Sequence, residues 1–115
     1  MFKKDMKYSL LLDFYGDLLS ERKKELIELY YNEDLSLSEV SEITGISRQG
    51  VRDSVKKAEC ELEDYESKLG MAKRFEDIQA NLEKAIIALH KIAERSGETE
   101  TEIYSVADFL SKRNL

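Results

Sequence analysis

The sequence contains no proline and only five glycines among its 115 residues, so little in it interrupts a helix. Charged residues make up 37% of the chain, and its apolar runs are only a few residues long. A chain of this composition is expected to form amphipathic helices separated by short breaks. We therefore predict an all-α fold, built as one small domain or as a compact head with an appendage.

Cysteine and histidine each occur only once, and this excludes two kinds of chemistry. Cys60 has no partner for an internal disulfide, and His90 cannot form a metal site by itself. We expect Cys60 to be a plain packing or surface thiol and His90 to lie on a helix surface. The sequence shows no nucleophile paired with a base and no phosphate-binding glycine loop. We therefore expect a binding protein that is not an enzyme and uses no metal or cofactor.

Long hydrophobic runs are also missing. No segment has the continuous hydrophobicity of a membrane span, and the first five residues, MFKKD, lack the apolar core of a signal peptide. We expect a cytoplasmic protein without membrane insertion.

Residues 36–58 have the pattern of a helix-turn-helix, in which a glycine turn joins two helices. Ser36 and Glu39 predict a capping box, in which the side-chain oxygen of each residue accepts the backbone N–H of the other. Gly45 stands where the chain must leave the first helix with a positive φ. Ser47 is the expected N-cap of the second helix.

Apolar residues in this motif recur at helical spacing and predict a shared buried side for the two helices. These residues are Val40, Ile43, Ile46, Val51 and Val55. The same spacing leaves Arg48, Gln49, Arg52 and Lys56 facing outward.

Two helices are expected before the motif, over about residues 4–18 and residues 21–32, with Ser20 as the N-cap of the second. Their predicted buried sides contain Tyr8, Leu11, Leu12, Phe14, Tyr15 and Leu18, then Leu26, Leu29 and Tyr30. The last helix of the motif continues to about residue 69, where Gly70 either ends it or only weakens it. We assign residues 1–70 to a helix-turn-helix domain and residues 71–115 to a C-terminal helical extension.

The C-terminal extension contains a coiled-coil-like seam with alternating spacings of three and four residues. Its members, together with Ile86, which widens it, are Phe75, Ile78, Leu82, Ala85, Ile86, Leu89 and Ile92. This seam either forms a homodimer interface or covers the first two helices and completes a monomer's core. We favour the homodimer because the head already has its own apolar set. A capping box of Thr99 and Glu102 predicts a last helix with Ile103, Ala107 and Leu110 on one face.

The formal net charge of −6 opposes indiscriminate binding to phosphates. Positive charge is nevertheless concentrated in residues 47–58, which contain Arg48, Arg52, Lys56 and Lys57 against Asp53. Residues 59–68 are acidic instead. The basic start of this helix could approach a polyanion while its acidic end stays away, or both could be ordinary solvated faces.

The middle of the chain resembles the fourth conserved region of bacterial sigma-70-type factors, which reads the promoter −35 element. The matching segments are LSER at 19–22, LYY at 29–31, LSEVSE at 37–42 and ISRQGV at 46–51. The resemblance implies a sigma region 4-like head, followed here by long amphipathic helices.

More closely, the chain resembles the YlxM family of small bacterial helix-turn-helix proteins over about residues 8–92. The matching features are DFY at 13–15, LL at 18–19, LYY at 29–31, SRQ at 47–49, Val51, Asp53 and LEDYESKL at 62–69. Members of that family are encoded beside the genes of the signal recognition particle. The resemblance therefore implies a regulatory or accessory role in that pathway, with its components as partners. The chain departs from the family pattern at Ser41, Gly50 and Arg52.

These observations predict a nucleic-acid-binding protein whose ligand is DNA or a structured RNA. In helix-turn-helix docking, the first turns of the second helix reach base edges, and we expect the lysines that follow to meet phosphates. The predicted contact residues are Ser47, Arg48, Gln49, Arg52, Asp53, Lys56 and Lys57. The alternative is a protein adaptor of the targeting machinery that keeps the motif as a scaffold and offers its acidic stretch, residues 59–66, to a basic partner.

Overall fold

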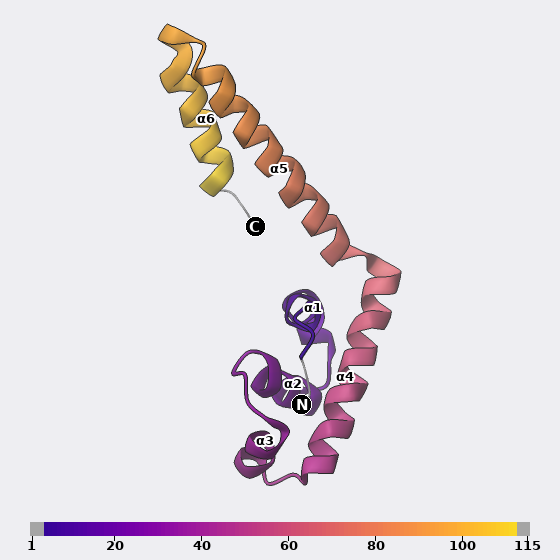
Figure 1. The fold of residues 1–115 in the computed structure, drawn as a ribbon. Helices are drawn as coiled ribbons and strands as arrows, with labels where there is room; N and C mark the ends of the chain where they lie inside the picture. The colour runs from indigo at the N-terminus through magenta and orange to yellow at the C-terminus, as the bar shows by residue number, and fades with distance from the viewer. Residues whose placement is uncertain (1–3, 113–115) are drawn as a thin grey trace. The chain divides into compact units, whose positions relative to one another are not determined.

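The structure is a computed structural model that describes residues 4–112 (Figure 1). Over this range the chain is helical and contains no strand, which confirms the predicted all-α class. Its elements are α1 (Lys7–Tyr15), the 3₁₀ turn η1 (Gly16–Leu18), α2 (Glu21–Tyr31), α3 (Leu37–Thr44), α4 (Arg48–Leu69), α5 (Met71–Ala93), the 3₁₀ turn η2 (Gly97–Thr99) and α6 (Glu100–Lys112). They fall into two units, Met1–Ala72 and Lys73–Leu115, which we call the first unit and the second unit.

The first unit is built on α4, against which α1, α2 and α3 pack. Val51, Val55, Ala58 and Leu62 follow one another along α4 at spacings of four, three and four residues and form its buried side. This spacing keeps them on one stripe of the helix. The buried residues that α1, α2, α3 and the segments beside them contribute to the same core are Leu11, Leu12, Tyr15, Leu19, Leu26, Ile27, Tyr30, Tyr31 and Val40.

The first helix is shorter than predicted, because the chain tightens into η1 after Tyr15. The predicted caps of α2, α3 and α4 are confirmed. The Ser20 hydroxyl accepts a backbone N–H in the first turn of α2. Ser36 and Glu39 form the capping box of α3, with both hydrogen bonds 3.0 Å long. Gly45 follows α3 with a φ of +75°, and the Ser47 hydroxyl accepts a backbone N–H of α4 at 3.0 Å. The helix-turn-helix therefore forms from the capping signals in its own sequence.

Two predicted core residues are exposed instead. Leu18, 55% exposed, lies in η1. A 3₁₀ turn has three residues per turn, so the α-helical spacing that placed Leu18 with the core does not apply there. Ile43, 62% exposed, lies in the last turn of α3. That helix is only eight residues long, and its one buried residue is Val40.

Two core residues were missed in α2. Ile27 and Tyr31 are buried beside the predicted Leu26 and Tyr30. The cause is that α2 packs against α1, α3 and α4, and contact with three helices buries a wider arc than one stripe.

Gly70 ends α4, which settles the question that the sequence left open. Its φ is +60°, the left-handed conformation of a helix C-cap. Directly beyond it, the Tyr15 hydroxyl accepts the Met71 N–H at 3.0 Å, and the Glu66 carboxylate accepts the Ala72 N–H at 3.0 Å. The first N–H groups of α5, which have no partner within their own helix, are thereby satisfied by side chains of the first unit.

The second unit is a hairpin in which α5 and α6 run antiparallel, side by side (Figure 1). Ala93 and Ala107 are fully buried, and Ile103 and Leu110 are half-buried on the predicted face of α6. The rings of His90 on α5 and Tyr104 on α6 meet edge to face, with centroids 5.0 Å apart.

The predicted dimer seam on α5 is divided in the structure. Phe75, Leu82, Ile86 and Leu89 are half-buried, whereas Ile78, Ala85 and Ile92 are exposed. No residue of this seam is fully buried within the chain.

Candidate nucleic-acid interface

The candidate interface is the start of α4, which the turn at Gly45 and the cap at Ser47 hold in place. All seven predicted contact residues are exposed, namely Ser47, Arg48, Gln49, Arg52, Asp53, Lys56 and Lys57. The opposite side of the same turns carries the buried Val51 and Val55. The core of the first unit therefore fixes the direction in which these polar side chains point.

The four cations of this surface are exposed to solvent. Within residues 4–112, Arg48, Lys56 and Lys57 form no ion pair with another side chain. Arg48, Arg52 and Lys56 are spaced by four residues, so they follow one another along one side of α4. Successive basic side chains on one stripe can contact successive phosphates or base edges of a groove.

Two of these cations also border α2 and α3. Arg52 and Lys56 line a small hollow together with Tyr30 of α2 and Leu37 of α3. The basic stripe therefore runs along the side of α4 that adjoins the first helix of the motif.

Gln49 and Asp53 are held together within the surface. The Gln49 amide Nε2 donates to the Asp53 carboxylate at 3.0 Å, one helical turn away. This bond still leaves the Gln49 amide oxygen and one amide hydrogen, together with the Asp53 carboxylate, for hydrogen bonds to a ligand.

Gly50 has a packing role that the sequence did not reveal. A Cβ built on this residue would lie 2.9 Å from the Ile46 Cγ2 atom and 3.1 Å from the Ser47 hydroxyl. Both atoms belong to the turn, and the Ser47 hydroxyl accepts the Gly50 N–H. The glycine thus allows the turn to fold closely against the first turn of α4.

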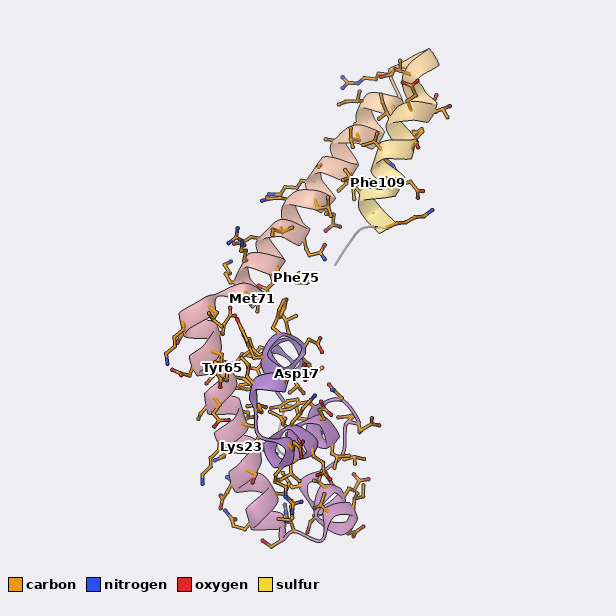
Figure 2. All side chains as sticks on the ribbon, turned by 180° about the vertical axis from the view of Figure 1, so that it is seen from behind. Asp17, Lys23, Tyr65, Met71, Phe75 and Phe109 are labelled. Carbon is orange, nitrogen blue, oxygen red and sulfur yellow. The ribbon has the colours of Figure 1, made fainter. Side chains whose placement is uncertain are left out.

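The acidic half of α4 is bound to the other helices of the first unit. Tyrosine hydroxyls of α1 and α2 donate to its carboxylates in three places, Tyr8 to Glu63, Tyr15 to Glu66 and Tyr31 to Glu59. Lys23 of α2 pairs with Glu61 at 2.8 Å and lies between α2 and α4 (Figure 2). These contacts were not predicted from the sequence, although the spacing of residues 59, 63 and 66 places their side chains on one side of a helix.

Burial shifts the pKa values of the tyrosines, and hydrogen bonding shifts that of Glu63. Bonds from Lys7 and Tyr8 hold the pKa of Glu63 below its ordinary value. Burial, followed by the bond to Glu63, raises the pKa of Tyr8 to about 12. Burial and the bond to a carboxylate likewise raise the pKa of Tyr31. At neutral pH the tyrosines are therefore hydrogen-bond donors and Glu63 is an ionised acceptor.

The single cysteine and the single histidine are both surface residues. Cys60 is a free, exposed thiol, and His90 is exposed on α5.

Across the described residues, no group of three or more histidine, cysteine, aspartate or glutamate side chains is arranged to hold a metal ion. In the same range, none of the helices combines the length and the hydrophobicity needed to cross a bilayer.

Comparison with known proteins agrees with this architecture. The family model described as "Putative helix-turn-helix protein, YlxM / p13 like" (UPF0122) matches residues 2–107. A UPF0122 protein of Thermoanaerobacter sp. (strain X514) is 43% identical over 104 residues, covering 90% of this chain and 87% of the relative. Another, from Caldanaerobacter subterraneus subsp. tengcongensis, is 51% identical over 76 residues, covering 66% of this chain and 65% of the relative. The chain therefore belongs to the UPF0122 family of YlxM/p13-like helix-turn-helix proteins.

Proposed function

We propose that this chain binds nucleic acid through the start of α4, and that this binding serves a regulatory or accessory role in the signal recognition particle pathway. One observation carries the proposal. The cations of residues 47–57 are exposed, whereas the glutamates at 59, 61, 63 and 66 on the same helix are bound by side chains of α1 and α2. The surface offered to a polyanion is therefore the basic one, although the whole chain is acidic.

Duplex DNA is the ligand that fits this geometry best. The major groove of B-DNA admits an α-helix, whereas the major groove of A-form RNA is too deep and narrow for side chains to read. With α4 in the groove, Arg48, Gln49, Arg52 and Asp53 of its first two turns reach base edges, and Lys56 and Lys57 meet phosphates. A folded RNA offers the same contacts only where a bulge or loop opens its groove.

The pathway is taken from the resemblance to YlxM proteins, whose genes lie beside those of the signal recognition particle. The RNA of that particle is therefore the ligand to test beside duplex DNA. An adaptor that uses the acidic stretch has less support, because most of those carboxylates already accept hydrogen bonds within the first unit.

The proposal is tested by fluorescence anisotropy with a labelled pool of random duplex DNA and with the folded RNA of the particle. The test variant is Arg48→Ala/Arg52→Ala. The control, Arg74→Ala/Arg95→Ala, removes the same charge at two exposed arginines outside the first unit. We expect the wild type to bind at least one ligand and the test variant to bind it about 10- to 100-fold more weakly, as expected for the loss of one good side-chain contact or more. The control should stay within about twofold of the wild type, because equal loss of net charge has a smaller effect away from the interface.

Two results would overturn the proposal. One is a wild type that binds neither ligand at low salt. The other is equal weakening by both double variants, which would mean that only net charge matters. Capture of a protein of the targeting machinery that is unaffected by Arg48→Ala/Arg52→Ala would favour the adaptor function instead.

A further inference from the structure

The hairpin of the second unit has almost no core of its own. Among residues 73–97 and 99–112, only Ala93 and Ala107 are fully buried, and an alanine contributes a single methyl group. Ile78, Ile87, Ile92 and Val106 are 43–50% exposed. Isolated helices are marginally stable in water, and their stability in proteins comes from packing an apolar face against a partner. Within the second unit, no further layer covers this apolar surface.

Helix geometry shows where the exposed apolar residues gather. Each residue advances an α-helix by 100°, so Ile78, Ala85 and Ile92, seven residues apart, lie close to one line along α5. Around the axis of α5, this line is rotated by about 60–100° from the direction of the buried Ala93. His90 is rotated by about 60° in the opposite sense.

The contact between His90 and Tyr104 fixes how the two helices are turned toward each other. Around the axis of α6, Tyr104 is rotated by about 60° from the direction of the buried Ala107, and Val106 is rotated by about 100° in the opposite sense. The rings of His90 and Tyr104 meet on one face of the antiparallel hairpin. Val106 must then share the opposite face with the line of Ile78, Ala85 and Ile92. We call this opposite face the apolar face.

The half-buried leucines and isoleucines beside these residues extend the apolar face toward the line where the helices meet. They are Leu89, Ile103 and Leu110. No charged residue lies on α5 between 78 and 92 within this arc, because Glu83, Lys84 and Lys91 fall on the other sides of the helix. By contrast, the face that carries His90 also holds Ile87 and Glu83, which line an open groove with Ser111.

We propose that the apolar face binds a second copy of this chain, so that two hairpins form a four-helix bundle. The seven-residue spacing is typical of helices that pack side by side along their length. At about 1.5 Å per residue, the 23 residues of α5 extend about 35 Å, whereas the 13 residues of α6 extend about 20 Å. α6 is therefore too short to pack along the whole of α5, whereas α5 of a second copy has the full length and the same repeat.

The charges around the face fit a second copy better than a partner of one sign. Cations and anions alternate on the exposed sides of the hairpin, and Lys73 with Asp77 and Lys112 with Asp108 already form ion pairs within their own helices. Two copies are therefore not repelled by a large charge of one sign. In a symmetric pair the same patch is used twice, so Ala85, at the middle of the line, lies near its own equivalent and Ile78 and Ile92 flank the contact. This interface does not depend on the proposed nucleic-acid function.

Sedimentation velocity on the full chain tests the proposal with three single variants. Ile78→Glu and Ile92→Glu place a charge on the apolar face, and Ile87→Glu places one on the other face at a residue that is equally exposed, 50% against 49% for Ile78. We expect the wild type and Ile87→Glu to sediment as dimers of the 13.3 kDa chain. The two variants on the apolar face should sediment as monomers, because burying an unpaired charge is strongly unfavourable. A monomeric wild type at about 100 μM, or dissociation by Ile87→Glu alone, would overturn the proposal.

A cross-linking measurement keeps the proposal testable even if dissociation also unfolds the hairpin. In a Cys60→Ser background, Ala85→Cys should give a covalent dimer with a short bis-maleimide. Ala80→Cys, an exposed alanine on the other side of α5, should not. Efficient cross-linking at residue 80 and none at residue 85 would contradict the assigned face.

Discussion

The Tyr15 hydroxyl on α1 lies 2.6 Å from the Glu66 carboxylate on α4, and this pair bonds to the first two N–H groups of α5. Two further tyrosine–glutamate pairs lie along the same side of α4, at Glu63 and at Glu59. The acidic half of α4 is therefore a structural surface that attaches α1 and α2. The basic start of the same helix is the surface that we propose for nucleic acid.

The Tyr15 pair should contribute measurably to stability. Tyr15→Phe keeps the buried ring but leaves Glu66 and the Met71 N–H without this partner, so we expect the free energy of unfolding to fall by about 1–3 kcal/mol. Urea unfolding followed by circular dichroism measures the change. Tyr65→Phe is the control, because the Tyr65 hydroxyl makes only a long, exposed bond of 3.5 Å to the Leu18 carbonyl. Equal losses in the two variants would contradict a specific role for Tyr15.

Stability should fall in acid partly through Glu63. Its pKa in the folded chain is below the ordinary value of 4.5 because Lys7 and Tyr8 donate hydrogen bonds to the carboxylate. A lowered pKa means that the contribution is fully present above about pH 4.5 and is lost as the pH falls through the folded value. We expect the urea midpoint to decrease less between about pH 7 and pH 3 in Glu63→Gln than in the wild type. An identical decrease would show that Glu63 does not contribute.

The turn of the helix-turn-helix depends on glycine at residue 45. Its φ is +75°, and a Cβ there would meet no atom within 4 Å, so Gly45→Ala tests backbone strain alone. We expect a loss of about 1–2 kcal/mol in the free energy of unfolding. Gly45→Asn should lose less, because asparagine tolerates this conformation better. Equal stability of Gly45→Ala and wild type would mean that the turn rearranges.

Local signals explain what could be predicted from the sequence. The capping box of Ser36 and Glu39, the turn at Gly45 and the cap at Ser47 depend on residues a few positions apart, and all of them form. Exposure of Arg48 and its neighbours followed from the buried stripe on the opposite side of α4. The exposure of the candidate interface therefore follows from the local sequence pattern alone.

Contacts between distant segments explain what was missed. The bonds of Tyr8 and Tyr15 to α4 join residues more than 50 positions apart, so no local pattern pairs them. Ile27 is buried because three helices surround α2, and the local sequence of α2 does not indicate how many helices pack against it. Leu18 was misplaced because the chain tightens into a 3₁₀ turn at that point.

The salt dependence of nucleic-acid binding tests the central claim most directly, because it measures the phosphate contacts made by the start of α4. Lys56→Ala/Lys57→Ala should reduce the magnitude of the slope of log K against log salt by about 1.8, since each neutralised phosphate contributes about 0.9. Arg74→Ala/Arg95→Ala should leave the slope unchanged. An unchanged slope after removal of Lys56 and Lys57, in a protein that still binds, would contradict the account.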